Sequence, residues 1–238
     1  MGNQTAKTPK DKKRTEKEFS CTDCAVLNCE SRDSFWPDFC LTKELTKEEL
    51  DEVLALYDDP ENNRIACFAA EVESDFYCRY TRVEEIMAFA KRMGYRRIGI
   101  ATCAGLIRES RIFAQILRKH GFEPFGAVCK IGSVEKTRIG IKPEYTKKTG
   151  PIMCNPILQA KRLEKAETEL NVVVGLCVGH DTLFYKYSKV PVTTLITKDR
   201  VLGHNPAAAL YQADSYYRRL RQEGEPMAPS GPDEDADQ

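Results

Sequence analysis

Between residues 95 and 220, short apolar segments alternate with amphipathic helices, and this alternation constrains the fold of the 238-residue chain more than any other feature. Strands that alternate with helices form a parallel sheet covered on both faces. We therefore predict a small, doubly wound, Rossmann-like α/β domain with a mostly parallel sheet over this range. The segments predicted as strands are "RRIGIAT", "FEPFGAVCK", "NVVVGLC" and "VPVTTLIT".

Residues 45–94 are predicted to form a helical segment that packs on this α/β core. Capping boxes at Thr46–Glu49 and Thr81–Glu84 mark two helix starts, and Gly94 marks a helix end. A third helical pattern runs over roughly residues 61–77.

The two ends of the chain carry opposite charge and are expected to be disordered: a basic tail over 1–18 and an acidic tail over 221–238. The formal net charge is +0 and no nucleic-acid motif is present, so no nucleic-acid partner is expected. No apolar run approaches the roughly 20 residues of a membrane-spanning helix. With no secretory signal either, the expected location is the cytoplasm.

Ten cysteines are unusual for a cytosolic chain, where they indicate metal binding or thiol chemistry more often than disulfides. The first group has the spacing C-x2-C-x4-C-x10-C within residues 19–44, which we predict to be a metal-binding module. Four thiolates suit either Zn or an iron–sulfur cluster, and the spacing does not choose between them. A redox CxxC and unrelated free thiols are the alternatives. The predicted ligands are Cys21, Cys24, Cys29 and Cys40.

A second group of cysteines follows the predicted strands. Cys103, Cys129 and Cys177 each end a strand segment, and Cys154 stands directly before a helix start at Asn155-Pro156. Because the carboxyl ends of parallel strands meet at one edge of a sheet, these thiols are expected to gather at that edge. The other two cysteines, Cys67 and Cys78, are expected to lie in the core.

Two kinds of chemistry fit this second group. One is a second metal or iron–sulfur centre held by Cys103, Cys129, Cys154 and Cys177. The other is a nucleophilic or redox thiol, since a helix start lowers the pKa of a thiol such as Cys103. The candidate catalytic residues are Cys103, Cys177, His180 and His204.

Basic residues near the same edge suit an anionic substrate or cofactor, for which Lys130 and Lys136 are the predicted binding residues. Arg138, Lys198 and Arg200 are also expected near this edge. No G-x-G-x-x-G follows the first strand, so a nucleotide-binding role is weakly supported.

Several blocks carry a family resemblance: "CTDCAVLNC", "WPDFCLT", "RIGIATCAGL", "CNPILQA", "VGLCVGHDTLF" and "TKDRVLGHNPAAALY". In this order they resemble a bacterial and archaeal family of unknown function described as uncharacterised metal-binding proteins. The resemblance extends from Cys21 to about Tyr217. It implies metal ligation by Cys21, Cys24, Cys29 and Cys40, and it implies no reaction.

Three functions are open on these observations. The first is a cytosolic metal-binding protein with a second, thiol-based site for redox chemistry or electron transfer, working with a redox partner protein. The second is a Zn-stabilised enzyme whose edge Cys and His residues act on a small anionic substrate. The third is a metal-handling protein without catalysis.

Overall fold

The computed structural model describes residues 19–32 and 35–222. The predicted basic tail and nearly all of the predicted acidic tail lie outside these ranges. The chain divides into two compact units between Ile65 and Ala66, a point inside the predicted helical segment. The second unit contains the sheet and is described first.

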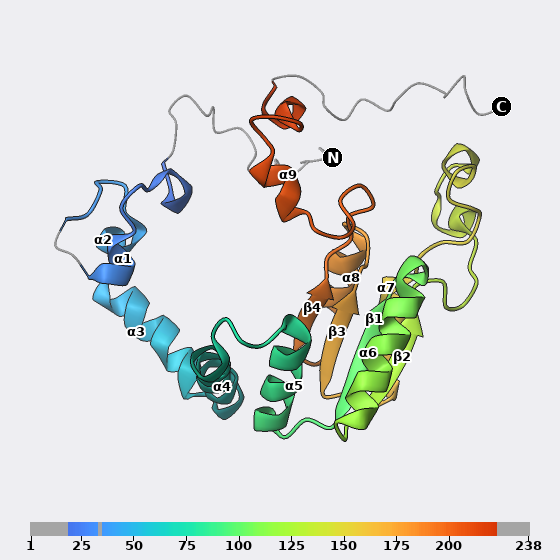
Figure 1. Cartoon of the computed structure of the whole chain (residues 1–238), viewed down its shortest axis with the longest axis horizontal. Coiled ribbons are helices and arrows are strands. Elements are labelled where there is room, and N and C mark those ends of the chain that lie inside the picture. The colour runs from blue at the N-terminus through green and yellow to red at the C-terminus, as the bar shows by residue number, and fades with distance from the viewer. Residues whose placement is uncertain (1–18, 33–34, 223–238) are drawn as a thin grey trace, which may run out of the picture. The chain divides into compact units, whose positions relative to one another are not determined.

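The sheet has four strands in the order β2-β1-β3-β4, and every neighbouring pair is parallel (Figure 1). The α/β class and the parallel sheet are therefore confirmed, whereas the finer Rossmann-like description stays a prediction. The strands are β1 (Arg97–Thr102), β2 (Glu123–Val128), β3 (Leu170–Val174) and β4 (Val192–Ile196).

Helices cover both faces of this sheet, because alternate residues of the central strands point to opposite sides. Ile98 and Ile100 of β1 pack with α5 (Arg82–Met93) and α6 (Ile107–Lys119). Ala101 packs on the other side with α7 (Pro156–Lys165) and α8 (His180–Tyr187). In Figure 1, α6 lies in front of the sheet and α7 and α8 lie behind it.

The predicted helix starts are confirmed. Thr46 and Thr81 form capping boxes at α3 (Lys47–Ala55) and α5, and Gly94 ends α5 with a φ of 77°. α4 (Pro60–Phe76) follows the third helical pattern. The remaining helices are short: α1 (Asn28–Ser31), α2 (Leu41–Glu44) and α9 (Ala207–Tyr211).

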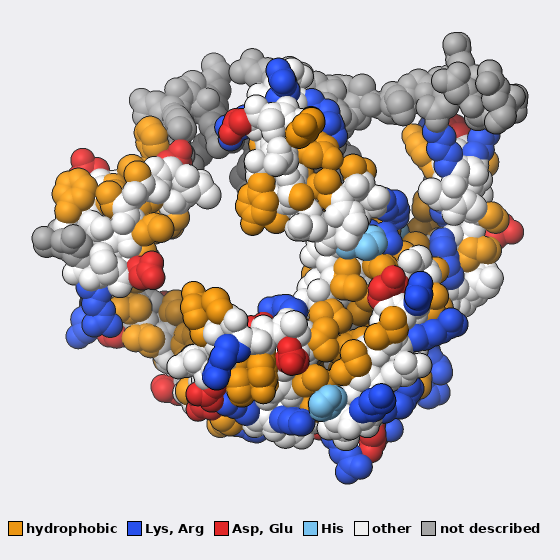
Figure 2. Space-filling view, in the orientation of Figure 1, with side chains coloured by type: hydrophobic (Ala, Val, Ile, Leu, Met, Phe, Trp, Pro, Cys, Tyr) orange, Lys and Arg blue, Asp and Glu red, His pale blue; other side chains and the backbone are white. Residues whose placement is uncertain are grey.

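Several apolar side chains of the first unit are exposed. Leu50, Val53 and Leu54 of α3 are each more than two-fifths exposed, and hydrophobic side chains are visible along this helix in Figure 2. The prediction that Cys67 and Cys78 lie in the core is wrong, since both are exposed. Cys78 lies beyond the end of α4 with a positive φ of 54°, so the helical face assumed for the pair does not continue to it.

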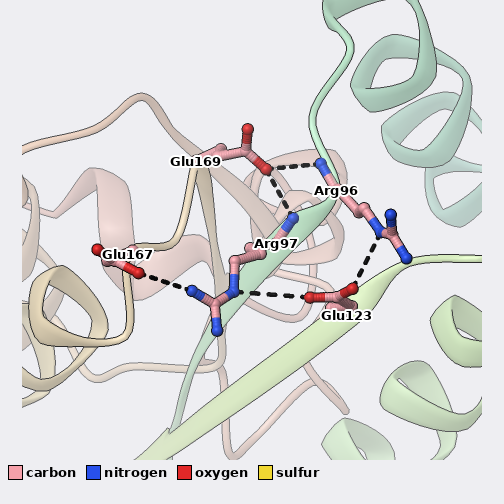
Figure 3. Close-up of polar contacts among 5 residues, drawn as sticks. All are labelled: Arg96, Arg97, Glu123, Glu167 and Glu169. Atoms are coloured by element: carbon pink, nitrogen blue, oxygen red, sulfur yellow. Dashed lines mark hydrogen bonds and ion pairs between the residues drawn. The ribbon is translucent and has the colours of Figure 1, made fainter.

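A polar network ties together the amino ends of three strands (Figure 3). The Glu169 carboxylate accepts hydrogen bonds from the backbone N–H groups of Arg96 and Arg97, both at 2.7 Å. The guanidinium groups of the same arginines pair with Glu123 and Glu167 at 2.9 to 3.6 Å. The exposed ion pairs contribute little each, but the Glu169 contacts with the backbone hold the start of β1 beside the chain that enters β3.

No helix in the described part of the chain is long and apolar enough to span a membrane.

Candidate functional site

The ends of β1 and β2 bring two cysteines side by side. Cys103 and Cys129 directly follow these strands, and the Cys129 N–H donates to the Thr102 carbonyl at 2.8 Å. The pair continues the parallel register, in which Thr102 lies opposite Val128. Neighbouring strands lie about 4.8 Å apart, and a disulfide needs Cα atoms about 4.4–6.8 Å apart. The backbone therefore places these cysteines within reach of a disulfide.

A third cysteine reaches the same place from a loop. The N–H of Asn155 donates to the Cys129 carbonyl at 2.7 Å, and the Asn155 side chain caps α7 by accepting from Leu158 N–H at 3.0 Å. Asn155 and Pro156 thus start α7 as predicted and fix the preceding residue, Cys154, beside Cys129.

The three thiols form a hydrogen-bonded row, called here the thiol row: Cys103, Cys129 and Cys154. Cys129 is in the middle, and its single S–H can donate to either neighbour, while Cys154 also lies within hydrogen-bonding reach of His180 at the start of α8. Cys129 is 2% exposed, whereas the two outer cysteines are partly exposed. The outer sulfurs can therefore meet a solute, and the middle one is shielded.

Hydrogen bonding divides the protons of the row unequally. The bond from Cys129 lowers the pKa of Cys103 to about 5, with further help from the Gly105 N–H and the Lys198 ammonium. The bonds from Cys129 and His180 lower the pKa of Cys154 to about 4. The contacts with Cys103 and Cys154, together with burial, raise the pKa of Cys129. These contacts favour the thiolate at an outer sulfur and the protonated thiol at the middle one.

Cations support the thiolates. Lys198 Nζ lies 3.6 Å from Cys103 Sγ, and the bond to Cys154 raises the pKa of His180. The Ala104 N–H, at the start of the 3-10 turn Ala104–Leu106, donates to Cys129 Sγ at 3.3 Å.

Cys177 occupies a different position from the one its sequence suggests. β3 ends at Val174, so Cys177 lies in the turn before α8 and not at the strand end. Its sulfur accepts a hydrogen bond from Arg200 Nη2 at 3.0 Å, and this contact raises the pKa of Arg200.

The thiols face a cavity of about 650 Å³. Ile139, Ile141, Met153, Ile157 and Leu183 form its apolar wall. The predicted anion-binding residues Lys130 and Lys136 also line it. The reactive side chains of the lining are the four edge cysteines, His180, Lys198 and Arg200.

Two of the lining lysines are anchored by their own contacts. Lys130 Nζ donates to the Ile152 carbonyl, and Lys136 Nζ donates to the Tyr145 carbonyl at 3.3 Å and to Thr149 Oγ1.

His204, predicted as a candidate catalytic residue, makes a hydrogen bond inside its own loop. Its Nδ1 accepts from the Asp199 N–H at 3.1 Å, and His204 is not among the residues that line the cavity.

Gln159 of α7 was missed by the sequence reasoning. It is fully buried, and its Nε2 donates to the carbonyls of Thr102 at 3.1 Å and Ala127 at 2.7 Å, near the ends of β1 and β2. Its spacing gives a usable signal, because Gln159 falls with Pro156, Ala160 and Leu163 on the buried face of α7. A polar residue on such a face has a buried partner.

The four cysteines of the first unit lie at the surface or partly exposed. Cys24 accepts hydrogen bonds from the backbone N–H groups of Leu27 and Val26, which lower its pKa and favour the thiolate, the form that binds metals. In the described residues, no three His, Cys, Asp or Glu side chains are placed to hold a metal ion together. Thiolate donors suit a soft metal, but the described side chains do not converge on one point. Metal ligation by these four cysteines therefore stays a prediction.

Comparisons with known proteins identify the family. Residues 40–195 match the model of the family described as "Protein of unknown function (DUF1847)"; this stretch holds Cys40 and the four edge cysteines. A protein of Methanocaldococcus jannaschii, described as uncharacterised, is 45% identical over 186 residues, which cover 78% of this chain and 94% of the relative. Neither description names a metal. The chain belongs to the DUF1847 family.

Proposed function

We propose that the protein carries out dithiol–disulfide redox chemistry at the sheet edge, with Cys103 as the attacking thiolate and Cys129 as the resolving thiol. The observation that carries this proposal is the thiol row, in which a partly exposed thiolate adjoins a buried, protonated thiol. A thiolate is the nucleophile in thiol–disulfide exchange. Cys103 lines the cavity, where an oxidant can reach it.

Cys154 and His180 lie beside the resolving thiol. Cys129 must lose its proton when it attacks, and Cys154 is hydrogen-bonded to it. As Cys129 Sγ attacks, its proton goes to the departing substrate sulfur, and the hydrogen bond between His180 and Cys154 keeps the thiolate form of Cys154 favoured. Two thiols lose two electrons in total, and the oxidant gains them.

Arg200 and Cys177 lie outside this exchange and belong to the wall of the cavity. The predicted metal module of residues 19–44 and the cytoplasmic location are separate proposals, which this chemistry does not require. A purely metal-handling function is the alternative from the sequence. The arrangement of the edge cysteines favours the thiol chemistry over it, because adjacent strands bring one pair within reach of a disulfide.

The test is a reaction of the reduced full-length chain with less than one equivalent of a small disulfide, followed by peptide mapping. The unaltered protein is expected to release two small thiols for each disulfide consumed. Cys129→Ser is expected to release one and to keep the other as an adduct on Cys103, because the resolving thiol is gone. Cys67→Ser serves as the matched control, since Cys67 is exposed on α4 and is not among the residues that line the cavity, and it is expected to behave like the unaltered protein. Release of two thiols by a Cys103→Ser variant would overturn the assignment.

A further inference from the structure

The cavity beside the thiol row limits what can oxidise it. Its volume of about 650 Å³ lies within the range of small-molecule sites, roughly 300–1,000 Å³. Cys103 is partly exposed and lines this cavity beside the buried Cys129, so a molecule that fits the cavity can reach the Cys103 sulfur. The size therefore favours a small molecule over a disulfide held in another folded protein.

The charged side chains that line the cavity are positive. They are Lys130, Lys136, Lys198 and Arg200, and none of the described residues that line the cavity is Asp or Glu. Arg200 gives Nη2 to Cys177 on the wall, and a guanidinium has five N–H donors in a planar fork that suits carboxylate. Such a lining attracts an anion.

The other part of the wall is apolar. Ile139 and Ile141 come from the loop after β2, Ile157 from the start of α7 and Leu183 from α8. These side chains offer burial to a hydrocarbon body but no hydrogen bonds. A ligand that uses both parts of the wall has an apolar body and an anionic end.

We infer that the substrate is a low-molecular-weight disulfide with an apolar body and a carboxylate or similar anionic group. This inference rests on the proposed function, since it names what the dithiol reduces. The anionic end would bind Arg200 and the neighbouring lysines, and the apolar body would lie against the isoleucines.

The reaction balances without a further reactant. Cys103 Sγ⁻ attacks one sulfur of the substrate R–S–S–R; a protein–S–S–R bond forms, the substrate S–S bond breaks, and RS⁻ leaves. Cys129 Sγ attacks Cys103 Sγ, and its proton passes to the second substrate sulfur. The Cys103–Cys129 bond forms, the mixed disulfide breaks, and RSH leaves. The protein loses two electrons, and the substrate gains them to become two thiols.

The experiment compares three aliphatic disulfides that differ in charge: 3,3'-dithiodipropionate, bis(2-hydroxyethyl) disulfide and cystamine. Second-order rate constants for oxidation of the Cys103–Cys129 pair are divided by those for a free small thiol, which removes the intrinsic reactivity of each reagent. The anion is expected to react fastest and the cation slowest. A longer-chain dicarboxylate, 6,6'-dithiodihexanoate, is expected to exceed the propionate because its chain reaches the apolar wall.

Arg200→Gln is expected to reduce the preference for the anion by about tenfold, the order of magnitude of one charged hydrogen bond. Lys161→Gln is the matched control, because it also removes one positive charge. Lys161 is exposed on α7, where it pairs with Glu164 at 2.8 Å. Equal normalised rates for all three disulfides would overturn the inference and leave the proposed function standing. Failure of every disulfide to oxidise the Cys103–Cys129 pair would overturn the proposed function itself.

Discussion

The buried thiol of Cys129 is the residue on which the behaviour of its neighbours depends. It supplies the largest influence on the low pKa of both Cys103 and Cys154. A single buried S–H thereby favours the thiolate form of the outer sulfur to which it donates. Removing it should change the chemistry of the cysteines beside it.

The pH dependence of Cys103 alkylation follows from this. Its pKa of about 5 lies below the usual value for a thiol, so the thiolate is present above about pH 5 and is lost as the pH falls through that value. The rate of reaction with iodoacetamide, followed by peptide mapping between pH 4 and 9, is expected to level off above about pH 6. In Cys129→Ala the midpoint should rise toward the ordinary thiol range. An unchanged midpoint would contradict the role given to the Cys129 hydrogen bond.

Gln159 offers a second test at the scale of one residue. Gln159→Leu keeps the approximate volume but removes the donors to the Thr102 and Ala127 carbonyls. The expected loss of unfolding free energy is about 1–3 kcal/mol, measured by urea denaturation. Closure of the Cys103–Cys129 disulfide should also slow, because Gln159 bridges the strands that carry both cysteines. Lys161→Gln on the exposed side of α7 is the control and should change neither quantity.

The turn after β3 is tightly constrained. Gly175 has a φ of 65°, and a Cβ atom there would lie 1.9 Å from Leu106 Cδ1. This contact fixes the turn that carries Cys177 against the start of α6. The turn therefore needs glycine both for its backbone conformation and for its space.

Two alanine substitutions separate these requirements. Gly121 also has a positive φ, of 85°, but a Cβ there meets nothing within 4 Å. Gly121→Ala is expected to cost about 1–2 kcal/mol of unfolding free energy, from backbone strain alone. Gly175→Ala should cost about 1–3 kcal/mol more, because Leu106 must move. Equal losses in thermal or urea unfolding would show that the Leu106 contact is unimportant.

The strand pattern of the sequence predicts part of the site. Strand ends are encoded by apolar runs, so Cys103 and Cys129 were expected at one edge and lie there. The apolar run "NVVVGLC" predicts Cys177 at a strand end, but β3 ends at Val174, where Gly175 follows with a positive φ. Contacts made by loops, such as Cys154 with Cys129 or Arg200 with Cys177, depend on tertiary packing and have no periodic signal.

At the scale of the whole molecule, cysteines occur in both units, and the two groups have separate predicted roles. The first four are predicted metal ligands, and the thiol row is proposed to do redox chemistry. Metal analysis of the full chain, purified without oxygen, distinguishes these roles. Cys24→Ser is expected to lower the bound Zn or iron, because a ligand is lost, whereas Cys103→Ser should leave it unchanged. Metal loss in Cys103→Ser alone would move the metal to the sheet edge and contradict the redox proposal.

Pairing of Cys103 with Cys129 can be measured by mapping disulfides in the full-length chain equilibrated in a graded dithiothreitol redox buffer. The proposal predicts that peptides containing Cys103 and Cys129 become cross-linked in a two-electron transition, before any other pair of cysteines. That result would identify the thiol row as the redox-active centre of the molecule. A chain in which Cys103 and Cys129 stay reduced, while other cysteines pair, would contradict it.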